Sequence, residues 1–336
     1  MRKKLSLFAI FVFLFAGCKQ EGGAINYVYE GDTIHINRFD SALMDYLTKE
    51  TEARSSDTSL FDRYPDFMEL YITHIVPIEK KATRQETMKE LISFFSDSTL
   101  FHLYKDAENR FSDTTPIEKE LSVACSFFAA NLPALKTPQV YFHVSGLNQN
   151  VVTGENILSL SIDKYLGEEY PLYKEIFYDY QRKTMLPERA AFDLCMGYLL
   201  SEFPYGGNDE VLLNKMLYWG KIRYILSKAF PGKDNPFIMG YTHEELLWCQ
   251  QNEAGIWKQI VGKKYLYSND RLLISKFTEP APRTAPLGND SSPMAGAWVG
   301  WQIIEKYMQN NPNVSLQELL ADNNYVEILK KAKYKP

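Results

Sequence analysis

The stretches QVYFHVSG (139–146) and NILSLSIDKYL (156–166) decide the fold of this chain of 336 residues. β-branched and aromatic residues dominate the first stretch, and apolar and polar residues alternate in the second, which predicts two strands. The connection between them, GLNQNVVTGE (146–155), is rich in glycine and asparagine and indicates a loop or an irregular hairpin. Because helical patterns fill most of the remaining chain, we expect an α+β fold that is mainly α-helical, with a small sheet packed against helices.

Helical patterns follow the two strands to the end of the chain. Predicted helices run over 187–202, 209–230, about 242–260, about 293–308 and onward from Ser315. Thr242 with Glu245, and Ser315 with Glu318, have the spacing of capping boxes. Gly296 and Gly300 lie one helical turn apart, which predicts that another helix backbone approaches closely there. The stretch TEPAPRTAPLGNDSSP (278–293) contains several prolines and is predicted to be a loop.

The region before the strands is also predominantly helical in pattern. Residues 60–135 repeat aromatic and aliphatic positions among charges, which predicts several helices. IHINRFDSAL (34–43) predicts a short strand followed by a helix start, with Asp40 and Ser41 as candidate caps. We therefore divide the body of the chain into a helical N-terminal part, 27–135, and a C-terminal part, 136–336.

The chain opens with a sorting signal. Residues 2–4 are basic, the run 5–16 is apolar apart from one serine, and small residues lead into Cys18. This pattern is typical of a secretory signal and is too short for a permanent membrane span. The small residues before the cysteine are similar to a bacterial lipobox, in which Cys18 is lipidated. We interpret 1–17 as a signal peptide and 18–26 as the lipidated cysteine and a tether; the alternative is an ordinary cleaved signal with an incidental cysteine.

The charge balance restricts the partners of this protein. The chain has 37 basic and 42 acidic residues, a net charge of −5. Without the three basic residues of the leader, 34 basic residues oppose 42 acidic ones, and the net charge is −8. This argues against nucleic acid as a partner and against electrostatic adhesion to anionic lipid. We expect the link to the membrane to be the acyl chains on Cys18.

Three cysteines remain in the body of the chain, and none forms a CxxC pair. Cys125 and Cys195 lie in apolar runs, which predicts buried thiols. One disulfide among Cys125, Cys195 and Cys249 is possible in an oxidising compartment, and the sequence does not select the pair.

The polar residues do not form a recognisable catalytic or metal motif. His243 and Glu244 begin like the zinc-protease motif HExxH, but Leu247 stands where the second histidine is required. His143 is either a site residue or, as we favour, a satisfied strand histidine. Asp163 at the end of the second strand is interpreted as solvated. The sequence therefore predicts no metal and no cofactor.

Five tryptophans lie in the last 120 residues or so of the chain, and such rings can build a glycan- or peptide-binding face. We interpret at least three of the five as helix core. They are Trp219, Trp248, Trp257, Trp298 and Trp301.

Long motifs in the second half carry a family resemblance. NKMLYWGKIRYIL (214–226), the stretch FIMGYTHEELLWCQQNEAGIWKQIVGKKYLYSND (237–270), SSPMAGAWVGWQIIEKYM (291–308) and AKYKP (332–336) closely resemble the gliding-motility lipoprotein family GldB. The resemblance covers about 27–336. It implies a Bacteroidota envelope lipoprotein, lipid-anchored at the outer membrane or the periplasmic face, that is tied to gliding and its associated secretion machinery.

The same family also resembles, distantly, the zincin-type metallopeptidases. In the register that this resemblance implies, Phe192 and Met196 take the histidine positions, Asp193 takes the glutamate position, and the third ligand falls near Trp219. Neither phenylalanine nor tryptophan can hold zinc, and methionine is a poor ligand for it. The resemblance therefore implies a zincin-like scaffold over 136–336 that has lost its metal and its peptidase chemistry.

These observations favour a non-catalytic envelope lipoprotein that assists gliding-motility or secretion machinery through contacts with envelope proteins. One alternative is a divergent metallohydrolase with other ligands, such as Asp193, His143 or Glu202. Another alternative is a lipoprotein that binds glycan or peptide through its tryptophan-rich half.

A functional surface is expected near the former metallopeptidase cleft. The candidate residues are Asp193, Trp219, Lys221, Arg223 and Arg283. The simpler interpretation of Lys221 and Arg223 is that they pair with acids such as Glu253. Arg283 lies in the proline-rich loop, where a stiff backbone would present it to a partner.

Overall fold

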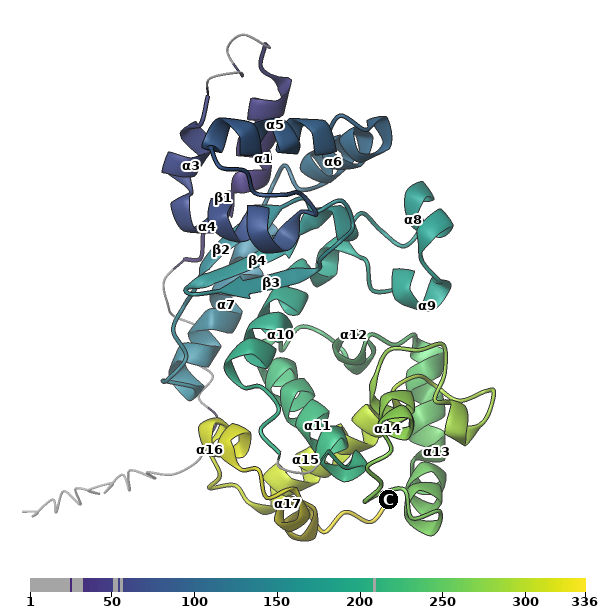
Figure 1. Ribbon diagram of the computed structural model, residues 1–336. Helices are drawn as coiled ribbons and strands as arrows, with labels where there is room; N and C mark the ends of the chain where they lie inside the picture. The colour runs from purple at the N-terminus through teal and green to yellow at the C-terminus, as the bar shows by residue number, and fades with distance from the viewer. Residues whose placement is uncertain (1–24, 26–32, 51–53, 55–56, 208–209) are drawn as a thin grey trace, which may run out of the picture.

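A four-stranded mixed sheet lies near the middle of the fold (Figure 1). The computed structural model describes residues 25, 33–50, 54, 57–207 and 210–336. The predicted signal peptide and Cys18 lie outside the described residues. The strands are β1 (Ile36–Arg38), β2 (Gln139–His143), β3 (Val151–Gly154) and β4 (Ile157–Ser161), in the order β1-β2-β4-β3. The first three strands in that order are parallel, and β3 is an antiparallel edge strand.

The two predicted strands are confirmed, and the connection between them contains a third strand. β3 and β4 form a hairpin in which Gly154 pairs with Ile157, and Asn156 in the turn has a φ of +56°. Segment 144–150 passes beyond the end of β4 to reach the outer edge, because β3 must run antiparallel to β4. An irregular hairpin between the two predicted strands is therefore wrong, because β2 and β4 run parallel, and the hairpin forms instead between β3 and β4.

Helices cover both faces of the sheet. Figure 1 shows α1 and α3 to α6 on one face, and α7 and α10 (Ala190–Glu202) on the other. The N-terminal elements are α1 (Phe39–Thr48), α3 (Ser59–Arg63), α4 (Pro65–Leu70), the π-helical turn η1 (Tyr71–Ile75), α5 (Arg84–Phe94), α6 (Ser98–Arg110) and α7 (Thr115–Asn131). The helical prediction for 60–135 is confirmed.

The start of α1 differs from the prediction that Asp40 or Ser41 would cap it. Helix α1 begins at Phe39, and Arg38 stands at the cap position without a side-chain cap hydrogen bond. Asp40 is fully buried in the first turn and forms an ion pair with Arg38 at 2.6 Å. The predicted caps are wrong because β1 leads directly into the helix and leaves no cap position free for these side chains.

The rest of the chain is almost entirely helical; in Figure 1, α8 and α9 lie beside the sheet, and the helices from α11 onward form a lobe below it. The elements of this part are η2 (Ile162–Lys164), α8 (Pro171–Ile176), α9 (Asp179–Arg182), η3 (Pro187–Arg189), α10 (Ala190–Glu202), α11 (Leu212–Ala229), α12 (Asn235–Met239), α13 (His243–Gly262), α14 (Arg271–Thr278), η4 (Ala285–Leu287), α15 (Ala295–Asn310), α16 (Leu316–Ala321) and α17 (Tyr325–Ala332). The predicted helices and both predicted capping boxes are confirmed. None of the described helices has the length and apolarity that crossing a membrane requires.

Helices α11 and α15 pack backbone against backbone, as the spacing of Gly296 and Gly300 predicted. A Cβ atom placed on Gly300 would lie 1.8 Å from the carbonyl oxygen of Met216, and one on Gly220 would lie 2.4 Å from the carbonyl oxygen of Gly300. Real Cβ atoms do not approach other atoms so closely. The crossing of these two helices therefore requires glycine on both of them.

One face of the sheet is polar but buried. Phe67 stacks on Tyr141 at 4.3 Å between ring centroids, and Tyr71 lies against His143, so α4 and η1 close this face. Ser159 and Ser161 on β4 are therefore fully buried. Their hydroxyls are satisfied inside the fold, since Ser159 Oγ contacts His143 Nδ1 and Ser161 Oγ contacts Asp163. Apolar and polar residues alternate along β4, but both faces of this strand are buried and neither faces solvent.

Candidate functional site

A cavity of about 300 Å³ opens beside the carboxyl end of β4, where α9, α10, α11 and the loop before α15 meet. In open sheets with parallel strands, ligands bind preferentially at this end. Basic side chains outnumber acidic ones in its lining: Lys164, Lys183, Arg189 and Arg223 against Asp193. We call this cavity the basic pocket.

Asp193 is held on one wall of the basic pocket by two partners. Its Oδ1 accepts a hydrogen bond from Arg189 at 2.9 Å, and its Oδ2 accepts one from the Tyr165 hydroxyl at 3.1 Å. Arg189 also donates to the carbonyl oxygen of Phe237 at 2.7 Å. Burial and the neighbouring Asp193 carboxylate raise the pKa of Tyr165 well above its ordinary value, so the phenol stays a donor. Both carboxylate oxygens of Asp193 are therefore engaged within the fold.

Arg223 contributes a second guanidinium, which forms no ion pair with any carboxylate in the described part of the chain. The residue is 6 % exposed, and its Nε has no hydrogen-bond partner. Among the described residues, its only hydrogen-bond contact is with Met196 Sδ at 3.2 Å, and the Trp219 ring lies 5.7 Å away. Burial and the neighbouring Arg189 lower the pKa of Arg223 to about 10, so it still carries its charge at neutral pH.

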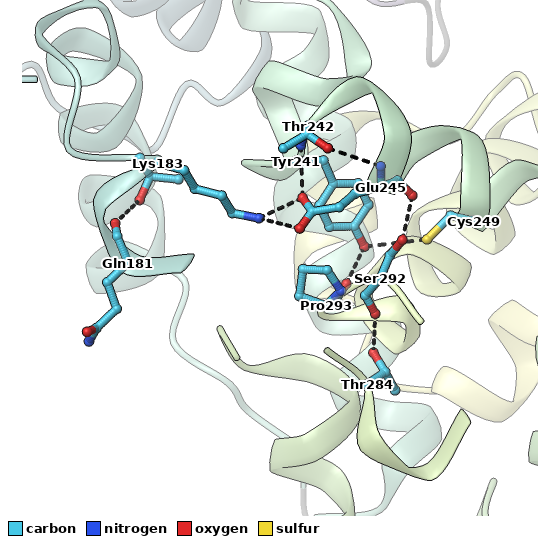
Figure 2. A network of polar contacts seen from close by, with 10 residues as sticks. Gln181, Lys183, Tyr241, Thr242, Glu245, Cys249, Thr284, Ser292 and Pro293 are labelled. Atoms are coloured by element: carbon cyan, nitrogen blue, oxygen red, sulfur yellow. Dashed lines mark hydrogen bonds and ion pairs between the residues drawn. The ribbon is translucent and has the colours of Figure 1, made fainter. Parts of the chain in front are cut away.

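Next to the basic pocket, an ion pair joins the residue after α9 to the first turn of α13. Lys183, just after α9, donates to both carboxylate oxygens of Glu245 in the first turn of α13, at 2.7 and 2.6 Å (Figure 2). Beyond this pair lies a wider opening of about 750 Å³, which shares Tyr180 and Lys183 with the basic pocket and is also lined by Tyr178 and Pro282. We call this opening the groove.

The loop before α15 is fastened to α13 by a second set of polar contacts, also visible in Figure 2. Ser292 Oγ donates to the carbonyl oxygen of Glu245 at 2.7 Å, and Tyr241 donates to the carbonyl oxygen of Pro293 at 2.6 Å. Met294 then adopts a φ of +49° as the cap residue of α15. Because Met294 lines the basic pocket, the first turn of α15 begins at the pocket wall.

The structure brings together some of the sequence-predicted site residues. Asp193 and Arg223 line the basic pocket. Trp219 lies beside Arg223 but does not line the pocket. Arg283 is exposed in the loop next to Pro282, which lines the groove. Lys221 lies apart from the pocket, where its Nζ donates to the carbonyl oxygen of Asp322 at 2.5 Å. Cys18 is outside the described residues.

The predicted pairing of Lys221 and Arg223 with Glu253 is wrong. Glu253 accepts a hydrogen bond from Tyr334 at 2.7 Å. Lys221 lies over the Tyr325 ring at 4.7 Å, and burial lowers its pKa to about 8. Helix α11 is buried nearly all round in its middle, and so these cations meet carbonyl oxygens, sulfur and rings instead of surface acids.

The three alternative metal ligands occupy separate places. Asp193 lies in the first turn of α10, and Glu202 is its last residue, about 13 Å further along the helix. His143 is fully buried within the sheet. Over the described ranges, no three His, Cys, Asp or Glu side chains come together in a metal-binding arrangement.

His143 leads to a testable pH dependence. Burial lowers its pKa from 6.5 to about 3, so the folded protein keeps it neutral. Below pH 6.5 the unfolded chain binds a proton that the folded chain does not, and stability falls as the pH falls toward 3. Between pH 7 and pH 5 we expect the wild type to lose about 2 kcal/mol more unfolding free energy than His143→Gln. Urea unfolding at both pH values measures this.

The control for this prediction is His74→Gln, because His74 is exposed at the end of η1. This variant should keep the pH dependence of the wild type. If His143→Gln lost as much stability on acidification as the wild type, the neutral buried state of His143 would be contradicted.

Three pocket residues were not predicted from the sequence: Lys164, Lys183 and Arg189. One signal for Arg189 was present, because it precedes Asp193 by four residues on a predicted helix, the spacing of an ion pair. For Lys183 there was no such signal, since its partner Glu245 lies 62 residues away.

Two of the five tryptophans belong to the core, where at least three were predicted. Trp298 and Trp301 are 2 % exposed and pack edge to face, whereas Trp219, Trp248 and Trp257 are half-buried at its edge. The three described cysteines are free thiols, and burial raises the pKa of Cys125 and of Cys249 to about 11. Thiols protonated in this way are poor nucleophiles.

Comparison with known proteins gives one family. The family model described as "Gliding motility protein GldB" matches residues 27–336. No curated protein and no solved structure matches the chain. The family match extends over the sheet, the basic pocket and the α11–α15 pair alike.

Proposed function

The chain belongs to the GldB family of gliding-motility lipoproteins, and from this premise we propose that it is a non-catalytic protein of the cell envelope that acts through protein contacts. It would assist the gliding-motility machinery or the secretion machinery that accompanies it. The family name supports an envelope lipoprotein. The finer assignment, anchoring through acyl chains on Cys18 at the outer membrane or the periplasmic face, is supported by the leader sequence.

The groove is the observation that carries the contact role. Tyr178, which lines it, is 73 % exposed, and Ile176 and Leu247 on neighbouring α8 and α13 are 54 % and 52 % exposed. Aromatic and aliphatic side chains are the usual anchors of protein interfaces. Tyr178 and Tyr180, which both line the groove, stack on each other with ring centroids 5.9 Å apart, so the groove offers a partner a paired aromatic surface.

A crosslinking experiment tests this role. We expect a photoreactive phenylalanine at position 178 of the full lipoprotein to capture one envelope protein reproducibly in intact cells, because the groove faces a partner. The matched control replaces Tyr267, which is 59 % exposed in the turn between α13 and α14, and should not capture that protein. Mass spectrometry of the crosslinked product identifies the partner. Recovery of no envelope protein, or equal capture from both positions, would contradict the proposal.

The loss of metallopeptidase chemistry forms part of the same proposal. The strands, then α10 and then α11 follow in the order of a zincin-like scaffold. Met196, at one of the two histidine positions of the expected register, contacts the Arg223 guanidinium. A fixed cation at this point opposes a metal ion by charge repulsion. Stoichiometric zinc in protein purified without chelator would overturn the non-catalytic assignment.

A further inference from the structure

We propose that the basic pocket binds a carboxylate group carried by an apolar segment of a partner protein. This inference rests on the proposed contact function and specifies the chemistry that the partner brings to the site. It starts from Arg223, which forms no ion pair among the described residues; Asp193, held by Arg189 and Tyr165, acts on its charge only from beyond ion-pair distance.

A buried cation without a counterion is costly, and an incoming carboxylate removes that cost. Arg223 is 6 % exposed, its Nε has no partner, and Met196 sulfur is a weak acceptor for the remaining donors. The planar guanidinium matches a carboxylate with two parallel hydrogen bonds. Asp193 cannot fill this role, because Arg189 and Tyr165 already occupy its two oxygens.

The surrounding charges favour an anion as well. Lys164 lines the pocket, lies over the Phe177 ring at 5.1 Å and has no carboxylate within ion-pair distance among the described residues. Lys183 and Arg189 each pair with one acid, so the four cations of the lining meet only two carboxylates in all, Glu245 and Asp193. Among the described residues, Lys164 and Arg223 are thus left without an ion-pair partner at the cavity, and the nearby carboxylates of Asp163 and Asp193 offset only part of their charge from beyond ion-pair distance.

The helix that begins at the pocket wall adds to this potential. Helix α15 has 16 residues, and its cap residue Met294 lines the pocket. The N-terminal end of a helix carries a partial positive charge that favours a nearby anion. Met294 is uncharged and makes no side-chain cap hydrogen bond, and the amide of Ala295 donates to the neutral Thr284 Oγ1 at 2.9 Å, so no negative side chain at these contacts cancels this potential.

The apolar part of the ligand follows from the other lining residues. Met185, Met196, Met239 and Met294 line the same cavity, and flexible thioethers adapt to apolar groups of varied shape. The basic pocket shares Tyr180 and Lys183 with the open groove. An extended segment can therefore lie in the groove while its carboxylate enters the pocket, which favours a protein segment over a small free anion.

Titration calorimetry with the full lipoprotein in detergent tests this inference. The probes are acetyl-Leu-Phe with a free carboxyl terminus, acetyl-Phe-Glu-amide, the uncharged counterpart of each (acetyl-Leu-Phe-amide and acetyl-Phe-Gln-amide), and inorganic phosphate. At least one carboxylate probe should bind about 10- to 100-fold more tightly than its uncharged counterpart, the range for losing a charge-assisted hydrogen bond. The carboxylate probe that binds more tightly shows whether the partner's carboxylate comes from a chain terminus or from an acidic side chain.

Arg223→Met should weaken the binding of that probe by a similar factor. It should also raise the thermal unfolding midpoint, because it removes a buried charge that has no ion-pair partner. Lys164→Gln provides a second variant at a less buried position and should weaken binding to a smaller extent. The matched control is Lys228→Met, on the same helix but outside the pocket, where Lys228 pairs with Glu305 at 3.5 Å. It should bind the probe as the wild type does.

Equal affinity for charged and uncharged probes, unchanged binding by both Arg223→Met and Lys164→Gln, or binding of phosphate alone would each overturn the inference. The crosslinking result at position 178 does not depend on these titrations. A partner captured without carboxylate binding would therefore reject the pocket chemistry and keep the contact function.

Discussion

Gly300→Ala is expected to lower the free energy of unfolding by more than about 4 kcal/mol, enough to prevent stable folding of many proteins. The new Cβ would lie 1.8 Å from the carbonyl oxygen of Met216 on α11. Relief requires that two helix backbones separate, and this opens the core around Trp298 and Trp301. Helix propensity alone predicts the opposite sign, because alanine is the better helix former by about 1 kcal/mol.

Urea unfolding followed by circular dichroism measures this effect. The matched control is Gly255→Ala on α13, an exposed helical glycine whose added Cβ would meet nothing within 4 Å. That control should gain about 0.5–1 kcal/mol from helix propensity. A Gly300→Ala protein as stable as the wild type would show that α11 and α15 are not packed as closely as described.

Asp163→Ala is expected to cost about 3 kcal/mol or more, because it leaves several buried donors without an acceptor. The carboxylate accepts hydrogen bonds from the backbone N–H of Ser145 at 3.1 Å, from that of Leu147 at 2.6 Å and from Ser161 Oγ at 2.5 Å. Gly146 and Leu147 have φ values of +69° and +66°, so the segment between β2 and β3 depends on these bonds to hold its conformation.

The loss should appear both in global stability and locally. We expect the amides of Ser145 and Leu147 to exchange with deuterium much faster in Asp163→Ala than in the wild type under native conditions. Glu155→Ala, at the exposed turn between β3 and β4, is the control and should change neither measurement. Protection of both amides in Asp163→Ala would mean that water or another acceptor replaces the carboxylate.

Helices, strands and helix caps were predictable from the sequence where the interactions that form them join residues close in the chain. The capping boxes at Thr242 and Ser315 were found because their hydrogen bonds span three residues. The strands and helices followed from periodicity, since burial of one face repeats with the pitch of the element. Gly296 and Gly300 indicated a close helix contact because a helix places residues four apart on the same face.

The candidate site was only partly predictable. Asp193 and Arg223 were named, but neither was predicted to have its observed partners. Lys183 meets Glu245 across the cleft, and Lys221 meets the carbonyl of Asp322, at separations of 62 and 101 residues. No periodicity within one element encodes such contacts, because they form only when separate elements pack.

Asp163 shows the division between sequence and tertiary structure most clearly. The sequence correctly predicted that this residue follows a strand. It was interpreted as solvated, however, and it is fully buried. The sequence by itself determined most of the helices and strands, the capping boxes at Thr242 and Ser315 and the glycines that let two helices meet, because short-range sterics and hydrogen bonds decide these. The tertiary structure alone decided which charges are buried, paired or left without a counterion, because burial depends on which distant elements cover a residue.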